Sequence, residues 1–493
     1  MRDCEDELIV GQKAAQLGYT EVALDKCFYA IDIKGLSVMY VLPASNPDAS
    51  DFSTSRFDPA LELSPHLNQM FSDVKNVGHK RAGSANLYLR GSRSRSQLKS
   101  VPVGLLILDE IDEFKQENIP LIFERMSGQR EKQAFLLSTP TIEHYGINAY
   151  YRRSSQDHFF FKCPHCSKWT ELTFPDCIVM TADDWADPKV RGSYLVCKEC
   201  KHELNHQAKR EWLKTAKWVP SYTDRDIKGF HINQLYSPTV RPFELAVSYL
   251  KGLTNPTDEQ EFFNSKLGLT HIVDGARIQD TNIEECTGTH KMTQYHSGGL
   301  VTMGVDVGKW LHYEIQQWFD DGFAEDVNLQ AKGKLLRAGK CLNFDELDQL
   351  MNDFSVAFCV IDANPERRKS FEFCQRWSGR ARMCYYSNGV SGKNIKLNDE
   401  EYSVSVDRTS WLDLALGRIH KGKTSLPIDL PDEYKRNLKA LVRVYKKDAQ
   451  GNPVGKYENG SADDHFAHAR NYNEIALKLA ANNTRHYNIS GVH

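Results

Sequence analysis

Two features are missing from this sequence, and each absence excludes a class of protein. No uninterrupted apolar run reaches the roughly 18 residues that a membrane-spanning helix needs, so we expect no membrane span. Charge of one sign is not in excess either, because 62 Lys and Arg oppose 65 Asp and Glu and give a formal net charge of -3. That balance excludes a uniformly basic protein that coats nucleic acid, but it permits a nucleic-acid enzyme with a local basic channel.

The first residues and the cysteines narrow the class further. Residues 1–7 are largely acidic and lack the apolar core of a secretion signal, so we expect none. The 12 cysteines could form disulfides in an extracellular protein, but four of them fall into two Cys-x-x-Cys pairs, which indicates metal binding in a cytosolic protein. A length of 493 residues predicts two to four domains, and 41% hydrophobic residues are typical of a soluble globular chain.

Apolar strands alternate with helices in the first part of the chain. Residues 36–42, 103–108 and 134–137 are continuous apolar runs of strand length, and a helix is expected over about 20–33. Continuous apolar strands between helices predict a parallel sheet that is covered on both faces. Ligands of such sheets bind at the carboxyl ends of the strands.

A candidate phosphate-binding loop lies at the first of these strand ends. The stretch Lys13-Ala-Ala-Gln-Leu-Gly18-Tyr19-Thr20 matches the end of the template Gly-x4-Gly-Lys-[Ser/Thr], but Tyr19 replaces the lysine. Lys13, at the other end of the loop, could supply the cation for the phosphates, and Thr20 the hydroxyl for Mg²⁺. On its own this pattern favours an ordinary strand–loop–helix junction.

Two later strand ends favour an ATPase. Leu105-Leu-Ile-Leu-Asp109-Glu110 has the form of a Walker B strand, in which Asp109 would serve Mg²⁺ and Glu110 would polarise the attacking water. The alternative is a buried strand with an exposed acidic turn. A third strand ends in Ser138-Thr139-Pro-Thr141, where motor ATPases place a polar sensor or coupling loop. The order of the three strand ends therefore favours an ATPase over the alternatives.

Four cysteines have the spacing of a zinc site. Cys163-Pro-His-Cys166 and Cys197-Lys-Glu-Cys200 are two knuckles, each of which presents two thiolates on one tight turn. Two such turns complete a tetrahedral shell around Zn²⁺, and because the protein fills all four positions the zinc would be structural. Redox dithiols and chance spacing are the alternatives.

Carboxylates recur at the ends of apolar segments in the last third of the chain. Asp306 ends the run 300–306 and Asp362 ends the run 354–362, while Asp463 and Asp464 stand at the start of a helix expected over about 462–481. Three converging carboxylates can hold two Mg²⁺ or Mn²⁺ ions that clamp a phosphodiester. Strand–Asp, strand–Asp, helix–Asp is the layout of a ribonuclease H-like nuclease, with Asp464 preferred over Asp463. For each Asp alone a strand-end turn or a helix cap is the favoured interpretation, whereas the ordered set favours the metal site.

Together these motifs resemble the large subunit of tailed-phage DNA-packaging terminases, especially the lambda-type branch. The resemblance covers nearly the whole chain, and a displaced lysine in the phosphate loop is itself typical of that family. The segments that carry it are Lys13–Thr20, Leu106–Glu110, Ser138–Thr141, Cys163–Cys166, Gly304–Gly308, Tyr236–Pro238 and Phe262–Leu267.

The resemblance implies an α/β fold with a P-loop (ASCE-type) ATPase, an inserted zinc ribbon and a ribonuclease H-like endonuclease. We expect an ATPase core at 1–155, the ribbon at 156–215, the end of the ATPase and a linker at 216–295, and the nuclease at 296–493. The implied activity is ATP-driven translocation of double-stranded DNA into procapsids and metal-dependent cutting of concatemeric DNA.

The resemblance also implies residue roles. ATP and Mg²⁺ would be bound by Lys13, Gly18, Tyr19, Thr20 and Asp109, with Glu110 as catalytic base. Coupling to DNA movement would fall to Ser138, Thr139 and Thr141, and the nuclease metals to Asp306, Asp362 and Asp464, with Asp463 beside them.

The implied partners are double-stranded DNA, the small terminase subunit and the portal protein of the procapsid. We further expect a homo-oligomeric ring during packaging, a location in the host cytoplasm and no membrane association.

Two other functions remain compatible with the motifs. One is a helicase-like or repair ATPase with a zinc ribbon, which predicts further helicase motifs after residue 216. The other is an assembly protein without ATPase activity, suggested by Tyr19 and by the short stretch before the phosphate loop. The basic loop Arg90–Arg95 is a candidate DNA contact, although a solvated loop is the favoured interpretation.

Overall fold

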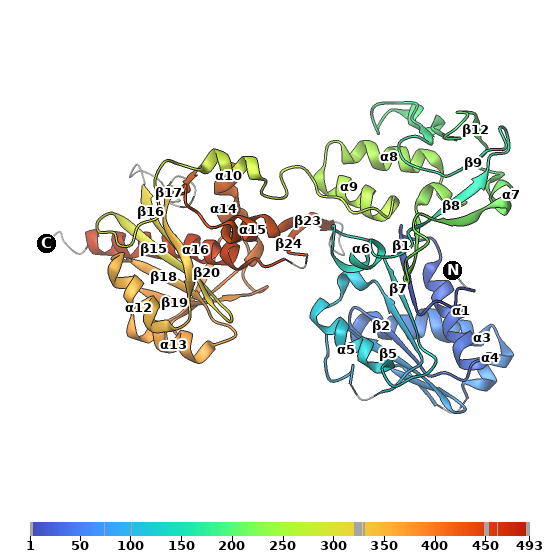
Figure 1. Ribbon diagram of the computed structural model, residues 1–493, viewed down its shortest axis with the longest axis horizontal. Helices are drawn as coiled ribbons and strands as arrows, with labels where there is room; N and C mark the ends of the chain where they lie inside the picture. Colours follow the sequence, from blue (N-terminus) through green and yellow to red (C-terminus); the bar gives the residue numbers. More distant parts are fainter. Residues whose placement is uncertain are drawn as a thin grey trace. The chain divides into compact units, whose positions relative to one another are not determined.

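The computed structural model divides the chain into two compact units, one formed by residues 1–273 and 445–453 and the other by residues 274–444 and 454–493 (Figure 1). The residues that the structure describes are 3–72, 74–99, 101–319, 328, 331–447, 453–460 and 462–489.

A parallel sheet forms the core of the first unit. Its central strand order is β14 (Lys228–Ile232), β1 (Leu8–Lys13), β7 (Gln133–Ser138), β6 (Leu105–Asp109) and β2 (Val38–Leu42), and every neighbouring pair is parallel. The strand that ends in the acids is thus separated from the phosphate-loop strand by β7. This order brings the carboxyl ends of β1, β7 and β6 side by side, as the sequence predicted.

Helices cover both faces of this sheet, which explains its uninterrupted apolar strands. At Gly11 of β1 a Cβ atom would lie 2.9 Å from the ring of Tyr19, in helix α1 (Tyr19–Asp32). At Gly229, which pairs with the preceding residue of β1, a Cβ atom would meet Ser154 and Tyr151, at the end of α6 (Gly146–Tyr151). Because successive strand residues point to opposite faces, α1 and α6 lie on opposite sides of the sheet.

Further strands extend this sheet at both edges. The first strand added at each edge is parallel to its neighbour in the core, and the strands beyond it are antiparallel. Beyond β2 lie β5 (Ala85–Gly91), β4 (His79–Ala82) and β3 (Val74–Asn76). Beyond β14 lie β8 (Asp157–Lys162) and β13 (Lys217–Pro220), and β9 (Trp169–Thr170) pairs with β8. Further helices of this unit are α2 (Ser50–Phe52), α3 (Asp58–Glu62), α4 (Pro65–Met70), α5 (Ile119–Phe123), α7 (Lys209–Trp212), α8 (Pro242–Gly252) and α9 (Pro256–Glu261).

The cysteine ribbon (residues 156–215) contains a small sheet of its own. Its strands are β10 (Ile178–Val179), β11 (Tyr194–Val196) and β12 (Glu203–Leu204), and both pairings are antiparallel. One knuckle follows β8 and the other lies between β11 and β12. Buried apolar side chains, among them Phe161, Leu195 and Trp212, give the ribbon a core continuous with α8.

The second unit has a mixed eight-stranded sheet. Three antiparallel strands, β15 (Leu300–Val307), β16 (Leu311–Phe319) and β17 (Lys332–Cys341), are joined through β15 to the parallel strands β18 (Phe358–Asp362) and β19 (Ala381–Tyr386). This is the ribonuclease H-like arrangement that the sequence predicted. The sheet is completed by β20 (Ile395–Asn398), β21 (Ser403–Val406) and β22 (Thr424–Ser425).

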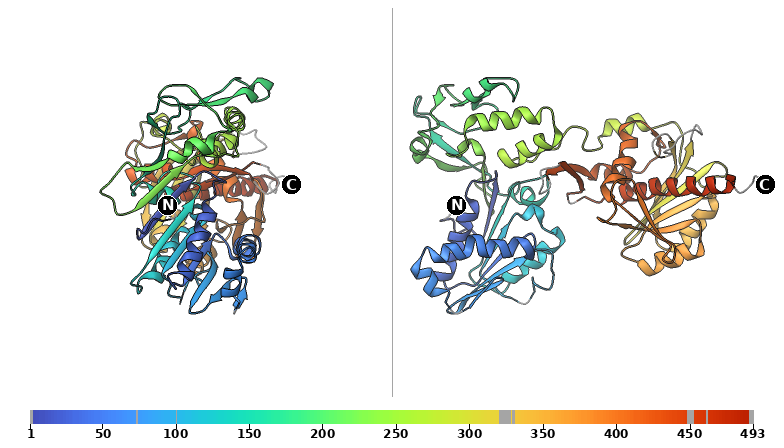
Figure 2. Two further views of the ribbon diagram at one scale, coloured as in Figure 1. Left: turned by 90° about the vertical axis from the view of Figure 1, so that its right-hand side faces the viewer. Right: turned by 180° about the vertical axis from the view of Figure 1, so that it is seen from behind.

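The long helix α16 (His465–Ile489) packs against β15, β16 and β18 (Figure 2). The closest approach is at Gly304, where a Cβ atom would lie 2.0 Å from the carbonyl oxygen of Ala469, so only glycine fits this position. Further elements of the second half of the chain are α10 (Asp280–Cys286), α12 (Phe344–Asp353), α13 (Arg367–Arg376), α14 (Arg408–His420), α15 (Asp432–Ala440), β23 (Val442–Lys447) and β24 (Pro453–Glu458).

Two element boundaries differ from the expectation. The strand expected over 354–362 begins only at Phe358, because Phe354 caps α12 and Ser355 has a left-handed φ of 48°. The late helix begins at His465 and continues to Ile489, past the point where its apolar periodicity ends. Among the described residues, no helix combines the length and the apolar character that crossing a membrane requires.

Candidate active sites

The phosphate loop and the acid-ended strand meet at the carboxyl edge of the first sheet. The Nζ atom of Lys13 lies 2.8 Å from Oε1 of Glu110, and the hydroxyl of Thr20 donates to Oδ2 of Asp109 at 3.1 Å. Gly18 precedes α1 with a left-handed φ of 78°, the backbone conformation that lets the loop turn into the helix. One cation, one hydroxyl and two carboxylates are therefore gathered at the N-terminus of a helix, where phosphates bind.

Asp109 has the environment of a metal-binding carboxylate. It is buried, its Oδ2 accepts from Thr20 and, at 2.7 Å, from Tyr40, and its Oδ1 has no hydrogen-bond partner among the described residues. Burial, followed by the negative charge of Glu110, raises the pKa of Asp109. A buried carboxylate oxygen without a partner is costly, and a Mg²⁺ ion bound beside Thr20 would satisfy it. The residues present thus fit a magnesium nucleotide.

Glu110 combines exposure with backbone strain. Its side chain is 41% exposed, and its φ of 61° is unusual for a residue other than glycine. Strain of this kind persists where the surrounding structure fixes the residue, as at functional sites. Its main-chain N–H donates to the carbonyl of Leu137 at 2.9 Å, which ties the carboxylate to the end of β7.

Tyr19 occupies the lysine position of the phosphate-loop template, but its side chain points into the core. The residue is 6% exposed and its ring packs against β1, and burial raises the pKa of its hydroxyl, which has no hydrogen-bond partner among the described residues. Its side chain is therefore not available to a phosphate. The position can contribute only its backbone N–H, in the first turn of α1.

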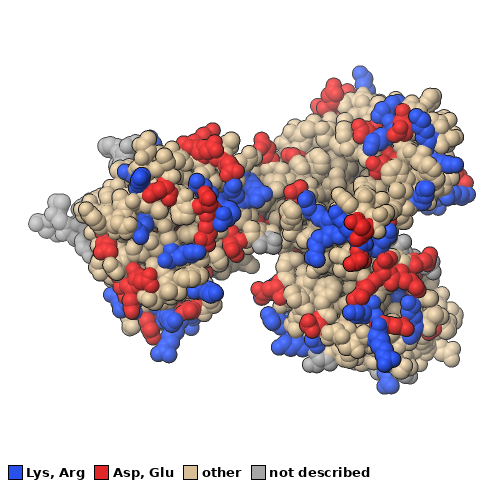
Figure 3. Space-filling view, in the orientation of Figure 1, with Lys and Arg blue, Asp and Glu red and all other residues tan. Residues whose placement is uncertain are grey.

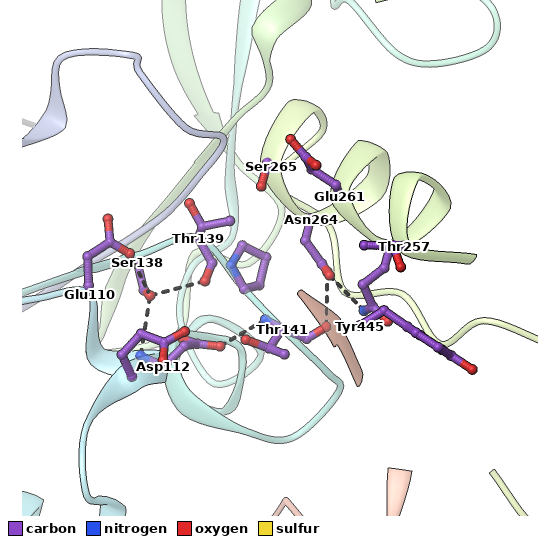
Figure 4. A pocket seen from close by; sticks show the side chains of 13 residues that line it. Glu110, Asp112, Ser138, Thr139, Thr141, Thr257, Glu261, Asn264, Ser265 and Tyr445 are labelled. Carbon is purple, nitrogen blue, oxygen red and sulfur yellow. Dashed lines mark hydrogen bonds between the residues drawn. The ribbon is translucent and has the colours of Figure 1, made fainter. Parts of the chain in front are cut away.

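The segment from Ser138 to Thr141 is tied to the residues that follow β6 and to Asn264 (Figure 4). The hydroxyl of Ser138 lies 3.4 Å from Oε2 of Glu110 and accepts from the backbone N–H of Asp112 at 3.3 Å. The N–H of Thr141 donates to Asp112 at 2.8 Å, and its carbonyl accepts from Asn264 at 2.9 Å. A displacement of Glu110 would therefore reach this segment through direct contacts. Thr139 lines the pocket that Figure 4 shows, together with Glu110 and Asp112.

Asp112 and Asn264 are candidate functional residues that the sequence interpretation missed. Asp112 is buried, accepts from the N–H groups of Thr141 and Ile147, and burial raises its pKa to about 7. Asn264 bonds the carbonyls of Thr141 and Leu269. Asp112 follows Glu110 by two residues and could have been noticed as a third acid. Asn264 lies in the segment Phe262–Leu267, which carried the resemblance but was given no role in the site.

The four cysteines converge at one point in the cysteine ribbon. The sulfurs of Cys163, Cys166, Cys197 and Cys200 all lie within 4.8 Å of one another, and those of Cys163 and Cys200 are 3.8 Å apart. A tetrahedral site with Zn–S bonds of about 2.3 Å places its sulfurs about 3.8 Å apart. The donor set therefore fits zinc in number, chemistry and spacing.

The two knuckles have the same local geometry. The residue two positions after the first cysteine of each knuckle donates its N–H to that cysteine's sulfur at 3.4 Å, from His165 to Cys163 and from Glu199 to Cys197. Such bonds stabilise a thiolate. Each turn is closed by a residue with a left-handed φ, Ser167 at 58° and Lys201 at 60°.

In the second unit, two of the predicted carboxylates lie at the ends of neighbouring parallel strands. Asp306 is near the end of β15 and Asp362 ends β18, and the residues before them, Val305 and Ile361, are paired in register. Burial, with the nearby negative charge of Asp306, raises the pKa of Asp362 to about 6. A carboxylate whose pKa is raised by a neighbouring carboxylate favours a cation beside it.

The acids before α16 differ in their surroundings. Oδ2 of Asp464 accepts from Asn459 at 3.1 Å and lies 3.4 Å from Nε2 of His468, whereas Asp463 is exposed. No role was predicted from the sequence for His465 or His468, at the start of α16. His468 instead contacts Asp464 and the hydroxyl of Tyr386, at 2.9 Å.

His465 lies directly against a predicted metal ligand. Its Nδ1 is 2.8 Å from Oδ2 of Asp306, and this hydrogen bond raises the pKa of His465. Ligand atoms of Asp306, His465 and His312 lie within 4.8 Å of one another, and the rings of the two histidines are stacked. Carboxylates suit Mg²⁺ and Mn²⁺, whereas imidazoles are ligands that transition metals prefer.

Two family models match the sequence, one over its first part and the other over the rest, and the second model begins inside the first structural unit. The ATPase domain of the phage terminase large subunit gpA matches residues 1–218, and the endonuclease domain of the terminase large subunit gpA matches residues 227–487. The chain belongs to the phage terminase large subunit gpA family. It is therefore an ATPase and an endonuclease that packages and cuts DNA, and it uses a nucleotide and divalent metal. The helicase-like and assembly-protein alternatives are not favoured.

This terminase is similar to solved structures of large terminases. The HK97 bacteriophage large terminase is 12% identical, with a TM-score of 0.50 and coverage of 97% of this chain and 92% of that one. The ATPase domain of the Thermus phage P74-26 large terminase is 11% identical (TM-score 0.33, 54% and 90% covered). The magnesium-bound nuclease of the phage G20c large terminase is 13% identical (TM-score 0.26, 40% and 95% covered). No curated protein matches the sequence.

Proposed function

We propose that ATP is bound and hydrolysed by the residues that meet at the ends of β1 and β6. Lys13 would neutralise the phosphates, the N–H groups of Gly18 and Tyr19 would donate to them, and Thr20 and Asp109 would hold Mg²⁺, which stabilises the charge that develops on the transferred phosphoryl group. Glu110 would accept the proton of the attacking water. The observation that carries this proposal is the pair of contacts Lys13–Glu110 and Thr20–Asp109.

Through the Lys13–Glu110 contact, nucleotide binding could activate the catalytic base Glu110. A phosphate that attracts the ammonium group of Lys13 would release the carboxylate of Glu110 to water. Ser138 and the backbone of residues 139–141 contact Glu110 and Asp112, so we assign coupling to Ser138, Thr139 and Thr141. Asp112 would act as a positioning residue for this segment.

Replacing Lys13 tests the nucleotide site directly. Lys13→Ala removes a charge-assisted contact worth about 1.5–3 kcal/mol, so the Kd for ATP should rise about 10- to 100-fold. Fluorescence titration with a labelled ATP analogue measures it. Lys34→Ala, which removes a half-exposed lysine that lies 3.7 Å from Glu5, is the control and should bind ATP normally. An unchanged Kd for Lys13→Ala would refute the proposed role.

We propose that Asp306, Asp362 and Asp464 hold the nuclease metals, with Asp463 in a lesser role. Two Mg²⁺ or Mn²⁺ ions would activate the attacking water and stabilise the leaving oxygen of a phosphodiester. His465 would orient Asp306 and His468 would orient Asp464. The raised pKa of Asp362 and its closeness to Asp306 support this assignment.

We infer that the cysteine ribbon holds one structural Zn²⁺. Because apparent binding energies of structural zinc are about 10–16 kcal/mol, losing one ligand should unfold the ribbon. Cys197→Ser should therefore abolish stoichiometric zinc in elemental analysis and expose the ribbon to proteases. Cys177→Ser, at a buried cysteine that is not among the four converging thiols, should keep its zinc. Full zinc content in Cys197→Ser would contradict the site.

The partners, the oligomeric state and the location of the chain are inferred from its family. We infer that the chain packages double-stranded DNA with a small terminase subunit, at the portal protein of a procapsid, as a homo-oligomeric ring in the host cytoplasm. Within the chain we assign the ATPase core to 1–155, the ribbon to 156–215, the end of the ATPase and the linker to 216–295 and the nuclease to 296–493.

A further inference from the structure

Three neighbouring strands, β8 and β9 of the cysteine ribbon and β13 directly after it, place basic and aromatic side chains on one face. Lys162 of β8 is paired with Trp169 of β9, and Phe160 of β8 is paired with Lys217 of β13. Because residues two apart in a strand share a face, Phe160 and Lys162 point to the same side, and their partners point there with them. We call Phe160, Lys162, Trp169 and Lys217 the lysine–tryptophan face.

The two lysines of this face are held but not neutralised. The Nζ atoms of Lys217 and Lys162 lie 4.1 and 5.8 Å from the centroid of the Trp169 ring, which is a cation–π arrangement. Both lysines are exposed, and neither forms an ion pair with any residue that the structure describes, while Trp169 is 40% exposed. A cation–π contact fixes an ammonium group but leaves its positive charge unpaired.

Two other lysines of the ribbon do have acidic partners. Lys214 lies 2.6 Å from Glu211, and Glu171 lies 3.3 Å from Lys198 and 3.0 Å from His158. The lysine–tryptophan face therefore keeps two positive charges. In Figure 3, Lys and Arg side chains gather over the part of the ribbon where Figure 1 labels β8 and β9.

A packaging enzyme with a formal net charge of -3 must hold DNA through local basic surfaces. Unpaired ammonium groups are suited to single phosphate oxygens, and the indole between them keeps both in place. We propose that the lysine–tryptophan face binds the phosphate backbone of double-stranded DNA. The inference rests on the proposed function in taking double-stranded DNA as the substrate, and it assigns the ribbon a part in gripping that DNA.

Salt dependence of DNA binding tests this face. Each phosphate contact contributes about 0.9 to the slope of log Kobs against log salt concentration. In an Asp306→Asn background, which prevents cutting, Lys162→Ala/Lys217→Ala should lower that slope by about 2 for a labelled 30-base-pair duplex. Affinity at low salt should fall at least tenfold, while zinc content and DNA-independent ATP hydrolysis stay unchanged.

Two matched variants separate charge from packing. Lys162→Arg/Lys217→Arg keeps the charges and should keep the slope. Lys251→Ala removes another lysine that lies over a tryptophan, at 4.9 Å from the ring of Trp185, and should leave the slope unchanged.

Three results would overturn the proposal. One is a double alanine variant that binds the duplex as wild type does. A loss of packaging with unchanged DNA binding would instead assign the face to an acidic protein partner. If the wild type itself fails to bind the duplex, the DNA function fails together with the face.

Discussion

Glu110→Gln is expected to reduce DNA-stimulated ATP hydrolysis about 10²- to 10⁴-fold, the range of a lost general base. The substitution keeps the size of the side chain and removes its ability to accept a proton. It also removes the carboxylate that lies 2.8 Å from Lys13, so the ammonium group is free for the phosphates. The Kd for ATP should therefore stay the same or decrease. Phosphate release and nucleotide titration measure the two quantities separately.

A matched control keeps this result interpretable. Glu117→Gln changes another exposed glutamate shortly after the same strand, one that lies 2.6 Å from Lys115, and should hydrolyse ATP as wild type does. Hydrolysis by Glu110→Gln within about tenfold of wild type would remove Glu110 from the role of base. A large rise in Kd would instead show that the glutamate mainly supports binding.

Asp306→Asn is expected to reduce Mg²⁺- or Mn²⁺-dependent cleavage of double-stranded DNA by about 10³-fold, because a bound metal supplies several kcal/mol of transition-state stabilisation. The protein should fold, since the change is isosteric and relieves the repulsion that raises the pKa of Asp362. ATP hydrolysis should persist. Conversion of supercoiled plasmid to nicked and linear forms measures the loss.

Neighbouring acids supply the controls for the nuclease. Asp464→Asn should lose cleavage as Asp306→Asn does, because Asp464 is held by Asn459 and His468. Asp463→Asn, at the exposed position beside it, should retain most cleavage, and Asp345→Asn, at an exposed residue in the first turn of α12, should retain all of it. Cleavage that survives Asp306→Asn would place the metals elsewhere.

Much of the fold could be predicted from the sequence, because it is encoded locally. Strands buried on both faces must be apolar throughout, so the sequences of β2, β6 and β7 could be recognised as continuous apolar runs. The acids at the end of β6 indicated the edge of the sheet where ligands bind. The knuckles Cys163–Cys166 and Cys197–Cys200 were visible because a metal turn needs two thiols at a fixed spacing.

The remaining features depend on contacts between distant residues. Asn264 binds the carbonyl of Thr141, 123 positions away, and His465 binds Asp306, 159 positions away. Composition and periodicity contain no signal for such pairs. At Tyr19 a local motif was misleading. Its position in the motif indicated nucleotide binding by the side chain, but an aromatic ring there is better accommodated in the core against β1 than in water.

The most direct test of two metal-dependent sites in one chain is an anomalous difference map from crystals soaked with Mn²⁺ and a slowly hydrolysed ATP analogue. We predict manganese within coordinating distance of Asp109 and Thr20, and separately of Asp306, Asp362 and Asp464, with a zinc signal at the four cysteines. A map in which manganese binds without contacting Asp109 or Asp306 would contradict the assignment of both sites.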